Sequence, residues 1–168
     1  MRELRELVVE IPDFPKPGIL FRDINPLLRQ RFHATVTAVD ALFSAREWET
    51  VDVVAGIESR GFILAAALAE RHGKGFVPIR KKGKLPPPVV DVAYDLEYGA
   101  GVLEMQRGSG RMLLVDDVLA TGGTLGASVT LAVQAGYEVR GMGVLLDLGL
   151  VPGFSSGGHA ARSVIQYA

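Results

Sequence analysis

The chain has 168 residues, 48% of them hydrophobic and 22% charged, which suits one globular domain (1–168) with a sizeable core. Its 18 basic and 19 acidic residues give a formal charge of −1, which argues against a general nucleic-acid binder. The absence of cysteine excludes disulfides, thiol nucleophiles and thiolate metal sites. No apolar run approaches the ~20 residues of a membrane helix, and the charged start lacks the apolar core of a signal peptide. We therefore expect a cytoplasmic protein with no membrane partner.

Helical and strand patterns alternate along the chain, which favours an α/β fold with a parallel sheet. Prolines force an irregular segment over 12–18, and Gly73 and Gly136 close two of the helices. We predict helices over 2–10, 32–45, 62–71 and from 125 to 136, and strands over 51–57, 75–79, 112–115 and 139–147. The Gly/Ser-rich segment 149–161 has no clear pattern, and its order is left open.

Residues 80–111 form a long excursion between two predicted strands. The run begins with basic residues and continues into Pro86–Pro88, which cannot be helical. Residues 89–98 alternate partly, as one arm of a hairpin does, and 103–106 are suited to the returning arm. A long excursion inside a globular domain is often a functional lid, so we predict a flexible lid here, with a plain surface hairpin as the alternative.

The segment 112–128 carries the most specific signal. A buried strand is followed by Asp116 and Asp117, then by the small residues 120–124, then by a helix. Small residues let backbone N–H groups close on a ligand, and a helix start adds free donors and a positive dipole end, which suits phosphate. The carboxylates suit hydroxyls or a ligand-borne cation. The combination predicts a sugar phosphate ligand, although a Gly-rich turn or an acidic pair by itself would mean little.

Several polar residues directly follow predicted strands: Glu58, Arg80, Asp116 and Asp147. Ligand sites of open α/β sheets lie outside the carboxyl ends of the strands. We therefore expect these side chains to converge. Two neighbouring residues of a strand point to opposite faces, however, so only one of the two aspartates would contact a sugar well unless the backbone turns directly after the strand.

Residues 116–124 resemble the phosphoribosyl-pyrophosphate (PRPP) signature of the type I phosphoribosyltransferases. Segments 13–23, 56–62 and 94–99 resemble the members of that family that use adenine, and the similarity extends in order over about 11–147. The resemblance implies a type I phosphoribosyltransferase fold, with a central, mostly parallel sheet flanked by helices and a hood. It implies transfer of the 5-phosphoribosyl group from PRPP to adenine, giving AMP and diphosphate, with Mg²⁺ carried by the substrate and with a homodimeric enzyme.

The same resemblance implies a role for each matching residue. PRPP ribose and 5′-phosphate would be bound by Asp116, Asp117, Ala120, Thr121, Gly122, Gly123 and Thr124. Diphosphate would be bound by Ser59, Arg60, Arg80, Lys81 and Lys84, and adenine by Leu20, Phe21, Arg22 and Leu148. Glu97 would be the catalytic acid/base, with Glu104 as a less supported acidic neighbour, and Tyr98 would close over the site as part of the lid. No dedicated protein metal site is expected.

Two alternatives remain open. The PRPP signature is common to enzymes for other purine or pyrimidine bases, and segments 20–22 and 94–99 are what favour adenine. A PRPP-sensing regulator that binds nucleic acid should carry an added DNA-binding segment or a broad basic face, and neither is visible here.

Overall fold

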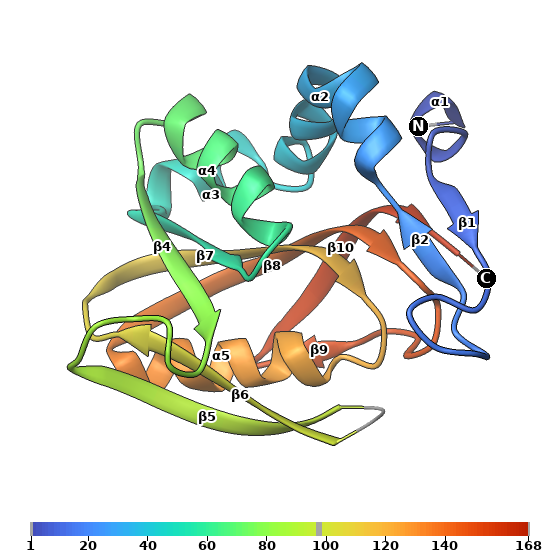
Figure 1. Cartoon of the computed structure of the whole chain (residues 1–168). Helices are drawn as coiled ribbons and strands as arrows, with labels where there is room; N and C mark the ends of the chain where they lie inside the picture. The colour runs from blue at the N-terminus through green and yellow to red at the C-terminus, as the bar shows by residue number, and fades with distance from the viewer. Residues whose placement is uncertain (1, 97–98, 168) are drawn as a thin grey trace.

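The computed structural model describes residues 2–96 and 99–167, and its centre is one eight-stranded sheet (Figure 1). Strands β4, β3, β7, β8 and β10 run parallel in that order, while β5, β6 and β9 join antiparallel at the two ends. The mostly parallel sheet predicted from the sequence is therefore confirmed. The strands are β3 (Val53–Ile57), β4 (Gly75–Lys81), β5 (Val89–Leu96), β6 (Gly99–Gln106), β7 (Gly110–Leu119), β8 (Tyr137–Asp147), β9 (Ser155–Ser156) and β10 (His159–Gln166).

Helices cover both faces of this sheet (Figure 1). One face is covered by α2 (Asn25–Asp40), α3 (Ala45–Thr50) and α4 (Gly61–Arg71), and the opposite face is covered by α5 (Gly123–Ala135). The β5–β6 hairpin at the end of the sheet lies on the same side as α5. Strand β7 lies in the middle and serves both sides. Its Leu113 and Val115 belong to the first hydrophobic cluster, whereas Met112 and Leu114 belong to the second. Burial on both faces explains why this strand has a continuous apolar sequence.

The N-terminal region differs from its prediction. The predicted helix over 2–10 is wrong beyond α1 (Arg2–Arg5), because β1 (Val9–Ile11) pairs antiparallel with β2 (Phe21–Asp23). Pairing across the Pro-rich turn outweighs the local helical preference. The next helix begins earlier than predicted, at Asn25, because Pro26 suits the first turn of a helix. It ends at Asp40 and not at 45.

Two other segments extend what was predicted. Strand β7 continues past 115 to Leu119, so the two aspartates lie within a strand rather than after it. The hairpin over 80–111 is present, and its second arm begins at Gly99, four residues before the predicted start. Val90, Val92 and Tyr94 of the first arm pack against the second hydrophobic cluster.

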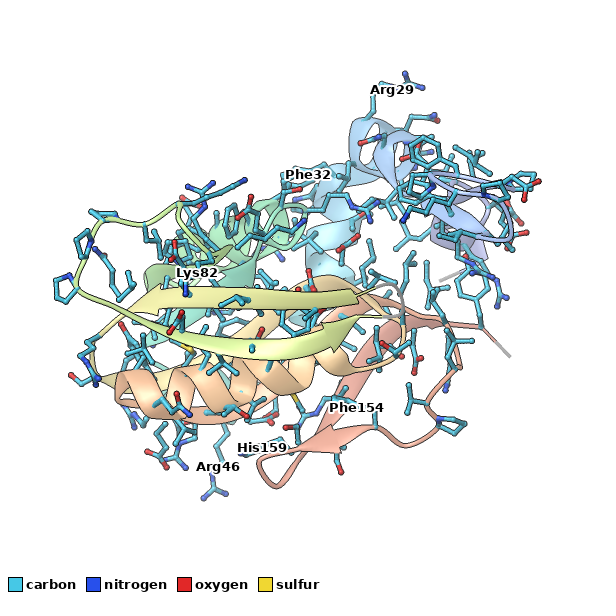
Figure 2. All side chains as sticks on the ribbon, turned by 60° about the horizontal axis from the view of Figure 1, so that its bottom comes forward. Arg29, Phe32, Arg46, Lys82, Phe154 and His159 are labelled. Atoms are coloured by element: carbon cyan, nitrogen blue, oxygen red, sulfur yellow. The ribbon has the colours of Figure 1, made fainter. Side chains whose placement is uncertain are left out.

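The segment over 149–161 has a defined course. Strand β9 pairs with the start of β10, and Phe154, beside β9 (Figure 2), packs on the second hydrophobic cluster. Within 2–96 and 99–167, no helix has the length and apolar character needed to cross a bilayer.

Helix α4 lies very close to strand β3. A Cβ atom on Gly56 would come within 2.9 Å of both the Ala65 Cβ and the Gly61 carbonyl oxygen. Such separations are shorter than real side-chain contacts, so the absence of a side chain at this position sets the distance between helix and sheet. The beginning of α4 is thereby brought to the carboxyl end of the sheet.

We expect Gly56→Ala to reduce the free energy of unfolding by about 1–3 kcal/mol, because the added methyl group meets rigid neighbours. Urea unfolding followed by circular dichroism measures the change. Gly126→Ala within α5 is the matched control: its nearest neighbours are 3.8 and 3.9 Å away, and we expect a gain of about 0.5–1 kcal/mol from the helical alanine. Equal stabilities of the two variants would contradict the close-packing argument.

Candidate active site

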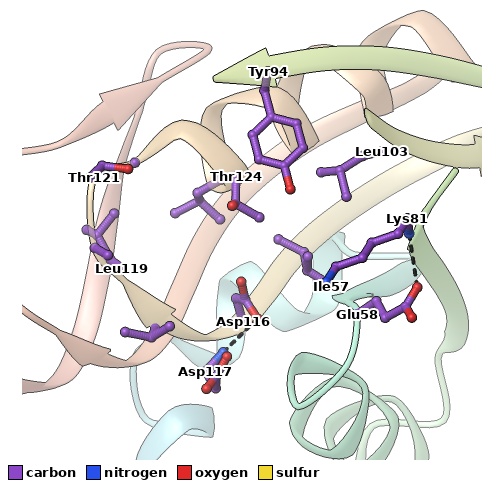
Figure 3. Close-up of a pocket in the computed structure, with 14 residues that line it drawn as sticks. Ile57, Glu58, Lys81, Tyr94, Leu103, Asp116, Asp117, Leu119, Thr121 and Thr124 are labelled. Atoms are coloured by element: carbon purple, nitrogen blue, oxygen red, sulfur yellow. Dashed lines mark hydrogen bonds between the residues drawn. The ribbon is translucent and has the colours of Figure 1, made fainter. Parts of the chain in front are cut away.

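A cavity of about 270 Å³ opens at the carboxyl ends of β4, β3 and β7 (Figure 3). One side is formed by the turn that leads into α5, and Tyr94 of the β5–β6 hairpin points into the cavity from the side across from Asp116 and Asp117. The lining residues are Ile57, Glu58, Lys81, Tyr94, Leu103, Asp116, Asp117, Val118, Leu119, Ala120, Thr121, Gly122, Thr124 and Leu125. Every residue predicted to hold the PRPP ribose and 5′-phosphate is in this set except Gly123.

Asp116 and Asp117 both line this cavity, although their positions in the strand alternate. The Asp117 backbone N–H donates to Asp116 Oδ1 over 2.9 Å, and Arg60 Nη2 lies 2.7 Å from Asp117 Oδ2 as an ion pair. Gly61 makes room for the first carboxylate, since a Cβ there would lie 2.7 Å from Asp116 Oδ1. Both carboxylates therefore border one cavity, and contact of both with a sugar stays a prediction.

Both carboxyl groups are nearly removed from solvent, with exposures of 7% for Asp116 and 6% for Asp117. Burial, and then the charge of its neighbour, raise the pKa of Asp116 well above its ordinary value. Burial also raises the pKa of Asp117, against the opposing effect of Arg60. Burial thus favours the protonated form of both carboxyl groups, and most strongly that of Asp116.

The turn before α5 has the shape expected of an anion-binding loop. Gly122 has φ +82°, a left-handed conformation that favours glycine, and it immediately precedes the first residue of the helix. A Cβ at Gly122 would overlap the Phe154 ring, so the turn is also held from outside by the ordered 149–161 segment. The N–H groups at the start of a helix have no intrahelical partners, and Thr124 and Leu125 of the first turn of α5 line the cavity.

A second set of carboxylate contacts organises the basic residues next to this cavity. Glu58 Oε1 accepts from Lys84 Nζ over 2.6 Å, and Glu58 Oε2 accepts from Arg80 Nε over 3.3 Å and from the Lys81 N–H over 2.9 Å. Although desolvation opposes them, these hydrogen bonds, led by that of Lys84, lower the pKa of Glu58 to about 2. Of the predicted diphosphate ligands, Lys81 lines the cavity, whereas Arg80 and Lys84 contact Glu58.

A second cavity of about 530 Å³ adjoins the first, and both are lined by Val118 and Ala120. All four residues predicted to bind adenine line it: Leu20, Phe21, Arg22 and Leu148. Arg60 also lines it, with its guanidinium carbon 5.1 Å from the centre of the Phe21 ring. Arg60 thus contacts a lining residue of each cavity, Asp117 of the first and Phe21 of the second.

Some predicted residues lie elsewhere. Ser59 is exposed and Gly123 is half-buried, and neither lines the two cavities. Asp147 does not converge with the others: its Oδ1 accepts from the Gly149 N–H over 2.9 Å, which shapes the turn that carries Leu148. Glu97 and Tyr98 lie outside the described residues, so their roles remain predictions.

Tyr94 lines the first cavity but was not assigned a role from the sequence. Its signal was present, because Val90, Val92 and Tyr94 share one face of an alternating strand and the last of them is the polar-tipped member. Gly101, its cross-strand partner, leaves room for the ring, since a Cβ there would lie 2.7 Å from Tyr94 Cε1.

Comparisons with known proteins agree with this geometry. A family model described as the phosphoribosyl transferase domain matches residues 32–148. The adenine phosphoribosyltransferase of Hydrogenovibrio crunogenus is 52% identical over 165 residues, covering 98% of this chain and 96% of the relative. The chain belongs to the phosphoribosyltransferase family, and within it to the adenine phosphoribosyltransferases.

Solved structures of that group are similar as well. The Saccharomyces cerevisiae adenine phosphoribosyltransferase, solved with an imino-altritol bisphosphate and adenine, has a TM-score of 0.88 at 32% identity, covering 97% of each chain. The enzyme from Thermoanaerobacter pseudethanolicus has a TM-score of 0.86 at 40% identity, covering 99% of each chain. The type I phosphoribosyltransferase fold is therefore confirmed.

We expect Asp116→Asn to stabilise the protein at neutral pH while weakening PRPP binding. A raised pKa means that the folded state keeps a proton that the unfolded chain releases, so stability falls as pH rises between the unfolded and folded pKa values. Asparagine removes that fall and still offers Oδ1 to the Asp117 N–H. Urea unfolding between pH 3 and 8 measures the difference in the free energy of unfolding between the variant and the wild type. The gain of the variant should vanish below about pH 4, near the ordinary pKa of Asp. A variant less stable than wild type at pH 7 would contradict this assignment.

Proposed function

We propose that this protein transfers the 5-phosphoribosyl group from PRPP to adenine, releasing AMP and diphosphate in a purine-salvage reaction. The observation that carries the proposal is that two cavities share Val118 and Ala120 in their lining, while Arg60 of the second pairs with Asp117 of the first. One is lined by the PRPP signature and the other by the residues that resemble an adenine pocket. A ribose held between them would have its anomeric carbon next to the base.

The 5′-phosphate is bound by backbone N–H groups of 120–124 and by the Thr121 and Thr124 hydroxyls. This assignment is supported by the left-handed Gly122 and by the helix start behind it. Asp116 and Asp117 accept hydrogen bonds from the ribose 2′ and 3′ hydroxyls. The negative charge that the pair carries beside Arg60 also favours the oxocarbenium-like sugar that forms as the bond to diphosphate breaks, and burial of the pair strengthens this effect.

The leaving diphosphate requires fixed positive charge. Lys81 lines the PRPP cavity, and Arg60 pairs with Asp117 in the wall of that cavity, which supports their assignment as diphosphate ligands. Ser59, Arg80 and Lys84 are assigned to the same group by resemblance. Arg80 and Lys84 would have to share their charge between Glu58 and the ligand.

Adenine occupies the second cavity, with Phe21 on one face of the purine and Leu148 on the other. The backbone of Leu20 and Arg22 reads its edge: a main-chain carbonyl accepts from the exocyclic amine of adenine, whereas a 6-oxo purine offers only an acceptor there. Support comes from the shared lining of one cavity by all four residues.

Magnesium enters as part of the substrate. No group of three or more acidic, His or Cys side chains that could hold a metal is found among the described residues, while diphosphate and ribose oxygens beside Asp116 and Asp117 offer the hard ligands that Mg²⁺ prefers. When bound, Mg²⁺ neutralises charge on the departing diphosphate. The protein's own residues position the sugar and exclude water.

Proton transfer at the purine is assigned to Glu97, and closure of the site to Tyr98. A carboxyl group near N7 can donate or share a proton while N9 attacks, and closure over the reactants strengthens these contacts by removing water. The hairpin that carries both residues joins the sheet beside Lys81, which supports a lid over this cavity. A single domain, a cytoplasmic location and a homodimeric state complete the proposal.

We expect the protein, given Mg²⁺ and PRPP, to form a nucleotide from adenine with kcat/KM at least about 100-fold higher than from hypoxanthine, guanine or orotate. A base that lacks the amine would leave buried polar groups unpaired. Nucleotide formation is followed by chromatography for each base separately. Equal turnover of hypoxanthine would reject the adenine assignment, and PRPP binding without turnover of any base would favour a regulator.

We expect Glu97→Gln to lower kcat by about 10²- to 10⁴-fold while changing PRPP affinity by less than about threefold, because the amide cannot transfer a proton. Steady-state kinetics and calorimetric titration with PRPP measure the two quantities. Asp91→Asn, on the same hairpin and exposed, is the matched control and should keep the wild-type kcat. Near wild-type turnover of Glu97→Gln would remove Glu97 from the mechanism.

A further inference from the structure

The basic segment 80–85 is held between two carboxylates from different strands. On one side is Glu58, at the end of β3, which binds Arg80 and Lys84 through their side chains. On the other side is Glu104 of β6, which faces Arg80 across the antiparallel pairing of β4 and β6. The two carboxylates therefore hold the same short stretch of chain from opposite sides.

Glu104 is 2% exposed, which is unusual for a charged side chain. Its Oε1 accepts from the backbone N–H groups of Lys84 over 2.6 Å and Leu85 over 2.7 Å, and its Oε2 accepts from that of Gly83 over 2.9 Å. No cation forms an ion pair with it in the described part of the chain. Three aligned N–H groups thus stabilise the buried charge, and the charge in turn fixes the turn that they belong to.

The consequence concerns the side chains that this turn displays. Arg80 and Lys84 are paired with Glu58, and Lys82 is paired with Asp91 over 2.6 Å on the outside of the hairpin (Figure 2). Lys81 differs: its side chain runs into the PRPP cavity (Figure 3), and no ion-pair partner for it is found within 2–96 and 99–167. Of this basic run, Lys81 presents the ammonium group that is available to an anionic ligand.

We propose that Glu104 is a positioning residue for diphosphate recognition: by binding the N–H groups of 83–85, it sets the turn that aims Lys81 into the cavity. The inference rests on the proposed function, and it assigns to Glu104 a task distinct from acid/base chemistry. Glu104 contacts no reacting atom. It acts through the backbone that carries Lys81 and Lys84.

An amide cannot replace this carboxylate. Glutamine offers one carbonyl oxygen, which can satisfy the Lys84 and Leu85 N–H groups, but its NH₂ group would face the Gly83 N–H, donor against donor. A buried donor without an acceptor is unfavourable, so the turn would move away. The side chains of 81 and 84 would then lose their alignment, while the 120–124 loop and the base cavity would keep theirs.

The test uses two ligands that differ at the diphosphate. PRPP contains a 5-phosphate, a ribose and a diphosphate, whereas AMP contains the phosphate, the ribose and the base but no diphosphate. We expect Glu104→Gln to weaken PRPP binding by about tenfold, the effect of one lost charge-assisted contact, and to change AMP binding by less than about twofold. Calorimetric titration of each variant with PRPP and with AMP, both with Mg²⁺, measures the two affinities.

Asp91→Asn is the matched control, because it removes one negative charge from the residue opposite Glu104 on the hairpin without touching the 83–85 turn. It should keep the wild-type affinity for PRPP. Gly83 provides an independent variant at an exposed position: its φ of +85° disfavours alanine but tolerates asparagine. We expect Gly83→Ala to weaken PRPP binding selectively and Gly83→Asn to restore most of it.

The outcomes separate the alternatives. Selective loss of PRPP affinity in Glu104→Gln, with Asp91→Asn unchanged, supports the positioning role. PRPP affinity within twofold of wild type, or equal losses for PRPP and AMP, overturns it. If Glu104→Gln does not fold, the Gly83 pair decides by the same criteria. If the wild-type protein binds AMP and PRPP but the variants do not behave as expected, the positioning role is wrong and the proposed function stands. If the wild-type protein binds neither ligand, the positioning role and the proposed function are both wrong.

Discussion

The buried pair of Asp116 and Asp117 is the constraint on which the rest of the site depends. Two adjacent carboxylates at 7% and 6% exposure repel each other and lose their hydration, so the surrounding structure must compensate. It does so with the Arg60 guanidinium at 2.7 Å and with a helix brought close by Gly56 and Gly61. The close approach of α4 to the sheet therefore brings Arg60, which directly precedes the helix, to this acidic centre.

Carboxylates also organise the cations of the molecule. Asp117 holds Arg60, Glu58 holds Arg80 and Lys84, and Glu104 holds the backbone between them. Long basic side chains lose considerable rotamer freedom when they are ordered, and these pairings order them before any ligand arrives. The cations beside the first cavity are thus ordered by acidic partners within the folded chain.

The local patterns of the chain carried a large share of the prediction. The apolar run of β7, the small residues of 120–124 and the helical stripe after them identified the strand, the turn and α5, because each reflects a period or a steric freedom that needs no distant partner. Where a distant partner decides, the prediction was wrong for residues 9–11 and left open for 149–161. Residues 9–11 became a strand because β2 pairs with them, and the 149–161 segment is ordered because Phe154 packs against Gly122 and the second hydrophobic cluster.

The sequence by itself determined the ligand chemistry of this protein: two carboxylates beside a glycine turn at a helix start, and a Pro-rich approach to Phe21. Only the tertiary structure decided how these groups are shared between sites. In the folded chain Arg60 contacts a lining residue of each cavity, and Arg80 and Lys84 pair with Glu58. Glu104 accepts hydrogen bonds from the backbone of the 83–85 turn. The physical reason is that the partner of a charged group depends on the distance between the two groups and on their burial. Both are set only when β3, β4, β6 and β7 come together in one sheet.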